Sequence, residues 1–279
     1  MILSFLIRGQ RKLVLPLRAL AFGLLLLFSD LSAHADGPTS NAARSTDSSP
    51  ALASPEAANT NPTPPHAIVL GFLGGFVRHD DAVHSTVQVA HDLQKDYSSI
   101  AWVETFENRR IDDAHDRILR LLGADHHGKP TTDEKNAARI ILYGHSWGAS
   151  AAISLARTLQ RDGIPVLLTV QVDSIAKSGQ NDALIPANVE RAANFYQTQG
   201  VLRGQPQIRA ADADRTKILG NFRVDYSANP ISCPTYPWFS RIFMRSHIEI
   251  ECDPGVWHKV EDLIRGQLAT SVVAQTGAQ

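Results

Sequence analysis

The fold of this chain is decided by residues 139–161, which read RIILYGHSWGASAAISLARTLQR. After Arg139, residues 140–143 form a short apolar run of the kind that a buried strand shows. Small and apolar residues then recur at helical spacing and predict a helix over 148–161: Ala149, Ala152, Leu155, Ala156 and Leu159. A strand, a tight turn and a helix therefore follow one another, and Ser146 lies on the turn.

This arrangement is the context that a nucleophile elbow requires. Gly144 and Gly148, two residues before and after the serine, lack a Cβ and so let the strand and the helix approach closely. The helix N-terminus adds positive potential where negative charge develops on a substrate. We therefore predict that Ser146 is a catalytic nucleophile. The alternative is a tight turn that carries a solvent-facing serine.

A glycine-rich turn, Gly71-Phe-Leu-Gly-Gly75, follows a predicted strand over 66–72. In a fold with an elbow, one oxyanion-hole donor is the amide after the nucleophile, which here belongs to Trp147. The second donor comes from the loop after an earlier strand. We expect Phe72 to supply it, with Leu73 as the next choice, although the loop could also be a plain glycine turn.

A catalytic serine needs a general base, and two histidines follow it in the chain, His247 and His258. His258 falls inside a predicted last helix, which begins at Asp253-Pro254 and runs to about residue 268. We therefore expect His258 on the surface and assign the base to His247.

The acid that orients this base has two candidates. Asp173 ends the long apolar strand predicted over 164–172, at the carboxyl edge of the sheet. Asp225 belongs to a late strand expected within 217–226 and is the alternative. We expect Asp173 to be the acid of a Ser146–His247–Asp173 triad.

The alternation of apolar strands and amphipathic helices predicts an α/β domain with right-handed crossovers. The first strands are expected at 66–72, 100–104, 139–143 and 164–172, and the helices at 81–96, 111–122, 148–161 and 187–199. Two segments have open roles. Residues 76–81 either line a pocket or, as we favour, begin the helix over 81–96, and the aromatic loop 234–239 is either a lid or core.

Residues 144–159, together with DGIPVLL at 162–168 and the pair Asp173-Ser174, resemble thioesterase-type α/β-hydrolases, and more broadly the thioesterase and lipase type of serine hydrolase. In that group the triad acid commonly follows this strand in an Asp-Ser pair, which favours Asp173. The resemblance implies a reduced α/β-hydrolase fold. We expect a mainly parallel sheet of about five or six strands with helices on both faces, because the segment before residue 66 cannot supply the hairpin that begins larger members.

The N-terminal 65 residues are expected to lie outside this domain. Residues 1–35 combine four basic residues, an apolar run over 19–28 and the small-residue stretch Ser32-Ala-His-Ala35, which predicts a cleaved secretory signal rather than an uncleaved anchor. Residues 36–65 are rich in Ala, Ser, Thr, Asn and Pro and predict a disordered linker. The domain is then expected over 66–270, with a flexible tail over 271–279.

Charge and cysteine content agree with an exported globular protein. The 279 residues include 27 basic and 28 acidic ones, which excludes a polycationic nucleic-acid binder. Signal removal takes away four basic residues and one acid and leaves 23 basic and 27 acidic residues, a net charge of -4. In an oxidising compartment Cys233 and Cys252 are expected to form a disulfide around His247, although both could be buried thiols.

The sequence therefore predicts a secreted or periplasmic serine hydrolase acting on a small-molecule or lipid ester, or on a thioester. Export makes a coenzyme A thioester an awkward substrate. We expect no cofactor, no metal, no nucleic-acid partner and no membrane span after signal cleavage. Peptidase activity, and a non-catalytic binding protein that keeps the fold, are the alternatives. The oligomeric state stays open.

Overall fold

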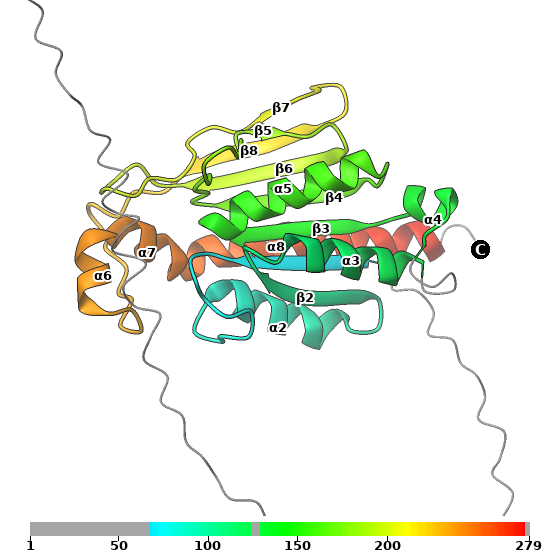
Figure 1. The fold of residues 1–279 in the computed structure, drawn as a ribbon. Helices are drawn as coiled ribbons and strands as arrows, with labels where there is room; N and C mark the ends of the chain where they lie inside the picture. Colours follow the sequence, from blue (N-terminus) through cyan, green and yellow to red (C-terminus); the bar gives the residue numbers. More distant parts are fainter. Residues whose placement is uncertain (1–66, 124–128, 277–279) are drawn as a thin grey trace, which may run out of the picture. The chain divides into compact units, whose positions relative to one another are not determined.

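Six strands form one parallel sheet in the computed structural model, which describes residues 67–123 and 129–276. The sheet order is β2-β1-β3-β4-β6-β8 (Figure 1). The strands are β1 (Ala67–Leu73), β2 (Ala101–Glu107), β3 (Ile140–His145), β4 (Val166–Val172), β6 (Val189–Tyr196) and β8 (Lys217–Arg223). The expected number and direction of strands are confirmed. The predicted signal and linker lie outside the described residues.

Helices cover both faces of this sheet, as expected (Figure 1). On one face α2 and α8 pack against the sheet, and on the other α3 and α5 do so. The helices are α2 (Ser85–Tyr97), α3 (Ile111–Leu122), α4 (Thr132–Asn136), α5 (Trp147–Arg161), α6 (Trp238–Phe243), α7 (Arg245–Glu251) and α8 (Pro254–Thr276). Two short strands, β5 (Leu184–Ile185) and β7 (Arg209–Ala210), form a separate parallel pair.

The central strands are apolar along their whole length because both of their sides are covered. Every residue of β1, β3 and β4 is buried. In β1, Ala67 and Val69 contact the layer of α2 and α8, whereas Ile68, Leu70 and Phe72 contact the layer of α3 and α5. Nearly continuous apolar runs are the pattern of parallel strands with helices on both faces.

The expected helix over 187–199 is wrong, since most of this segment forms strand β6. Its alanines suit a helix, but this preference is weak and the pairing with β4 and β8 overrides it. Asn194 lies buried within the strand, where its side-chain Nδ2 donates to Gln205 O at 2.8 Å and to Asn221 Oδ1 at 3.2 Å. These partners come from residues later in the chain, and a sequence window does not contain them.

Two element boundaries also differ from expectation. Helix α2 begins at Ser85 and has no acid in its first turn, so residues 76–81 precede the helix rather than begin it. Helix α8 continues to Thr276, beyond the predicted domain end at 270. No helix within the described ranges has the length and apolar character needed to cross a membrane.

The chain reverses its direction of travel across the sheet at β1. From β1 it crosses to β2 at one edge, and after β2 it returns to the other side of β1 to form β3. A crevice outside the carboxyl ends of the strands forms at such a switch point. The loop after β1 and the turn after β3, which carries Ser146, therefore meet at one place.

Two glycines let α5 approach β1 at this place. A Cβ added at Gly144 would lie 2.6 Å from the carbonyl oxygen of Phe72, and one added at Gly148 would lie 2.0 Å from the same atom. Neither distance is compatible with a real side chain. The spacing of the two glycines around Ser146 therefore sets how deeply the start of the helix enters the sheet edge.

We expect Gly148→Ala to lower the free energy of unfolding by about 3 kcal/mol, because strand and helix must separate to admit the methyl group. Gly266→Ala in α8 is the matched control, since a Cβ there meets nothing within 4 Å. Alanine should stabilise that exposed helical position by about 1 kcal/mol. Urea denaturation followed by circular dichroism measures both, and a Gly148→Ala variant as stable as wild type would contradict the close approach.

Candidate active site

Ser146 occupies a strained turn between β3 and α5. Its backbone angles are φ 57° and ψ −123°, a left-handed conformation that residues with a side chain rarely adopt. Its amide donates to Val172 O at 2.9 Å, and its carbonyl accepts from the amide of Ile175 at 3.2 Å. Hydrogen bonds to the end of β4 and to the residues after it thus hold the strained serine in place.

His247 from α7 reaches this serine. Its Nε2 lies 3.0 Å from Ser146 Oγ, and its Nδ1 lies 2.6 Å from Asp173 Oδ2. All three side chains are buried, with exposed fractions of 8% for Ser146, 7% for His247 and 0% for Asp173. The structure therefore brings together three residues that lie 101 and 74 positions apart in the sequence.

Asp173 follows β4 and is held by backbone as well as side-chain donors. Its φ of 44° is also left-handed. Its Oδ1 accepts from the amides of Gln197 at 3.1 Å and Gly204 at 2.9 Å, and its Oδ2 accepts from Gln197 Nε2 at 2.9 Å. Sequence reasoning missed Gln197 and Gly204, because Gln197 lies within the segment that was expected to be a helix and Gly204 follows it.

Asp225, the alternative acid, lies in a different environment. Its side chain is half exposed and forms an ion pair with Arg223 at 3.3 Å. Its Oδ1 accepts from the amide of Ser227 at 2.9 Å and from Gln199 Nε2 at 2.7 Å. The structure thus places Asp173, and not Asp225, against the ring of His247. His258, the other histidine considered, is exposed on α8.

The loop after β1 lies beside the serine at Gly74. The amide of Ile68 donates to Arg139 O beside β3, and successive amides of a strand point to opposite neighbours. The amide of Phe72 therefore faces β3 within the paired part of β1. Gly74 follows two residues later and lies beyond the last pair. A Cβ at Gly74 would lie 2.9 Å from Ser146 Cβ, so Gly74 adjoins the serine.

Asn108, at the end of β2, holds this loop. Its side-chain Nδ2 donates to Leu73 O at 3.1 Å and to Gly75 O at 2.5 Å, and its own amide also donates to Leu73 O. Asn108 is buried, and no sequence motif pointed to it. Phe76 then packs edge-on against Trp147, with ring centroids 5.7 Å apart. Residue 76 therefore lies beside the serine turn.

A second histidine–carboxylate pair, His145–Glu251, adjoins the His247–Asp173 pair. His145 Nδ1 is 2.8 Å from Glu251 Oε2, and His84 Nδ1 is 3.2 Å from Glu251 Oε1. The ring of His145 packs at a tilt of 31° against that of His247, with centroids 4.7 Å apart. Glu251 is the last residue of α7, so this buried acid joins α7 to the serine turn and to the start of α2.

The two partners shift each other's pKa in opposite directions. Burial alone would raise the pKa of Glu251, but the charges and hydrogen bonds of His145 and His84 outweigh it and lower the pKa from 4.5 to about 2. Burial alone would lower the pKa of His145, but Glu251 outweighs it and raises the pKa above 6.5. The pair is therefore charged over a wide pH range.

A disulfide closes the segment that carries His247. Cys233 and Cys252 are bonded with Cα atoms 5.9 Å apart, which confirms the pairing expected from the sequence. The bridge joins the chain before α6 to the residue after α7. In the aromatic loop, Trp238 is 67% exposed and is not core, whereas half-buried Tyr236 places its hydroxyl 3.2 Å from His84 Nδ1.

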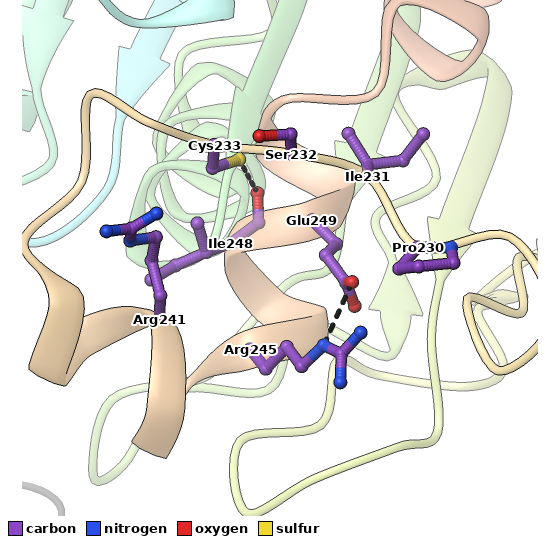
Figure 2. Close-up of a pocket in the computed structure, with 8 residues that line it drawn as sticks. All are labelled: Pro230, Ile231, Ser232, Cys233, Arg241, Arg245, Ile248 and Glu249. Carbon is purple, nitrogen blue, oxygen red and sulfur yellow. Dashed lines mark hydrogen bonds and ion pairs between the residues drawn. The ribbon is translucent and has the colours of Figure 1, made fainter.

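A pocket beside α6 and α7 is lined by none of the residues Ser146, His247 and Asp173 (Figure 2). An ion pair between Arg245 Nε and Glu249 Oε1, at 3.1 Å, lies along it. Its lining is formed by Pro230, Ile231, Ser232, Cys233, Arg241, Arg245, Ile248 and Glu249. No group of three or more His, Cys, Asp or Glu residues within the described ranges is arranged to hold a metal ion.

Comparisons with known proteins add little to this geometry. No protein-family model matches the chain, and no curated protein does. Among solved structures, the chain is similar to "RedJ with PEG molecule bound in the active site", with 11% sequence identity and a TM-score of 0.33. The match covers 72% of this chain and 95% of that one. At this level of similarity, nothing about function follows.

We expect Glu251→Gln to lower the free energy of unfolding by about 3 kcal/mol, because it leaves His145 buried without its counter-charge. This loss of stability should be greatest between pH 4.5, the ordinary pKa of Glu251, and pH 6.5, the ordinary pKa of His145. Glu251 has a lowered pKa, so its contribution fades as the pH falls from 4.5 toward about 2. His145 has a pKa raised above 6.5, so its contribution to stability fades as the pH rises above 6.5 and through the raised pKa.

Urea denaturation at about pH 5.5 and about pH 3 measures this difference. Glu190→Gln, at an exposed position of β6, is the matched control and should change stability by less than about 0.5 kcal/mol. A Glu251→Gln deficit that is the same at both pH values would show that the carboxylate charge plays no part.

Proposed function

We propose that this chain is an exported serine hydrolase that cleaves a carboxyl ester through an acyl-enzyme. The observation that carries the proposal is the hydrogen-bonded row Ser146–His247–Asp173, with distances of 3.0 Å and 2.6 Å. Its geometry meets the requirement that the nucleophile contacts a base and the base contacts an orienting acid. A binding protein that kept only the fold would not need this row.

In the proposed reaction the carboxylate of Asp173 accepts a hydrogen bond from the Nδ1–H of His247. The lone pair on Nε2 is then free to take the proton of Ser146 as the hydroxyl oxygen attacks the ester carbonyl carbon. His247 returns this proton to the leaving alcohol as the C–O bond breaks. Water then attacks the acyl-enzyme with the same base, which releases the acid and restores Ser146.

The negative charge on the carbonyl oxygen needs hydrogen-bond donors during both attacks. We assign them to the amides of Trp147, at the start of α5, and Gly74, beside Ser146. Gly74 replaces Phe72 in this role, because the amide of Phe72 lies in the sheet. The N-terminus of α5, a helix of 15 residues, adds favourable potential.

The strain at two residues supports a catalytic purpose. Ser146 and Asp173 both have positive φ, and among the described residues they are the non-glycine positions that do. Such conformations cost about 1–3 kcal/mol each and persist where the surroundings hold them. Here they aim the serine hydroxyl and the carboxylate at the two nitrogens of one histidine ring.

Export and an ester substrate belong to the same proposal. The Cys233–Cys252 disulfide is compatible with an extracytoplasmic location, because such bonds persist in oxidising compartments. The signal sequence expected over residues 1–35 would direct the chain there. Coenzyme A thioesters are intracellular metabolites, so a carboxyl ester suits this location better than a thioester.

We expect Ser146→Ala and Asp173→Asn each to lower kcat for p-nitrophenyl esters by about 10⁴-fold or more, because the first removes the nucleophile and the second disturbs the histidine tautomer. Comparing esters of graded acyl chain length, assayed by nitrophenolate release, also shows the longest acyl chain that the site accepts. Asp225→Asn is the matched control and should retain wild-type kcat. Activity that survives in Ser146→Ala, or that Asp225→Asn loses instead, would contradict the assignment.

A further inference from the structure

The loops after four neighbouring strands meet beside Ser146, and one of them brings a lysine. Asn108 follows β2, Gly74 follows β1, Trp147 follows β3, and Lys177 lies in the loop after β4. The carboxyl edge of a parallel sheet is where such folds bind their ligands. The proposed mechanism does not use Lys177.

Lys177 is fixed against the serine turn and the glycine loop. Its Nζ donates to Asn108 Oδ1 at 2.5 Å, and Asn108 in turn holds the carbonyls of Leu73 and Gly75. The same ammonium lies 5.3 Å from the centroid of the Trp147 ring, a cation–π distance. Lys177 is therefore an ordered cation rather than a free surface side chain.

The charge of this lysine is not neutralised by a nearby acid. Within the described residues, Lys177 has no carboxylate within ion-pair distance. Burial, and then the charge of Arg109, lower the pKa of Lys177. Glu107, the nearest acid in sequence to Asn108, contacts His79 at 3.2 Å and Arg110 at 3.8 Å instead.

We propose that Lys177 binds an anionic group of the substrate. The substrate class is then an ester that carries a carboxylate or phosphate a few bonds from its scissile carbonyl, with the apolar part between them against Phe76 and Trp147. This inference rests on the proposed function, since it places the scissile carbonyl at Ser146. A partly buried cation without a counter-ion gains most from such a group.

The hydrolytic test compares two esters that differ in charge: the mono-p-nitrophenyl ester of adipic acid, which keeps a free carboxylate, and its methyl ester, which does not. We expect wild type to prefer the anionic ester. Lys177→Gln keeps a donor for Asn108 but loses the charge, and should lower kcat/KM for the anionic ester about tenfold, through KM. The neutral ester should change by less than about twofold.

Two further variants control this comparison. Lys177→Arg keeps the charge and should retain the preference, and Lys259→Gln removes one exposed lysine from α8 and should have no effect. High salt should reduce the preference of wild type, because it screens the ion pair. An equal loss of activity toward both esters in Lys177→Gln, or no preference in wild type, would overturn the proposal and leave Lys177 as a support for Asn108.

A binding measurement separates failure of this inference from failure of the proposed function. If wild type hydrolyses neither ester, the proposed function is overturned, and calorimetric titration of the Ser146→Ala protein with monomethyl adipate and with dimethyl adipate still decides the anion site. Tighter binding of the monoester, weakened about tenfold by adding Lys177→Gln, supports it. Equal binding of the two compounds, or no effect of Lys177→Gln, overturns it.

Discussion

The contact of 2.6 Å between His247 Nδ1 and Asp173 Oδ2 joins two parts of the molecule that lie 74 positions apart in the sequence. Asp173 directly follows β4, a fully buried central strand, whereas His247 lies on a seven-residue helix outside the sheet. A short helix of this kind has little stability of its own. The position of His247 therefore depends on the contacts that hold α7 against the rest of the protein.

Two anchors act at the C-terminal end of α7. The Cys233–Cys252 disulfide begins at the residue after the helix, and Glu251 reaches from its last residue to His145 on the serine turn. Both anchors lie within five residues of His247. The packing of the His145 ring on the His247 ring adds a third contact between helix and turn. Ser146, His247, His145 and Glu251 are thus one connected polar cluster at the carboxyl edge of the sheet.

The sequence predicted the parts of this arrangement that local pattern determines. Apolar runs identified β1, β3 and β4 because both of their faces are buried, and the glycines around Ser146 identified the turn. Strand β6 was missed because its alanines favour a helix in isolation. Gln197 and Glu251 act through contacts with residues far away in the chain, which no motif records. The donor proposed from the structure, Gly74, lies two positions after the expected Phe72, a difference within the roughly two to four residues by which element ends read from a sequence vary.

The central claim is that Ser146 is a nucleophile activated by His247. Mass spectrometry of the folded protein after exposure to a fluorophosphonate tests it most directly, because such reagents phosphonylate an activated serine. We predict one adduct, on the peptide that contains Ser146, and a strongly reduced rate of labelling in a folded His247→Gln variant. An unlabelled Ser146 in the folded wild-type protein, or labelling that is as fast without His247, would contradict the account.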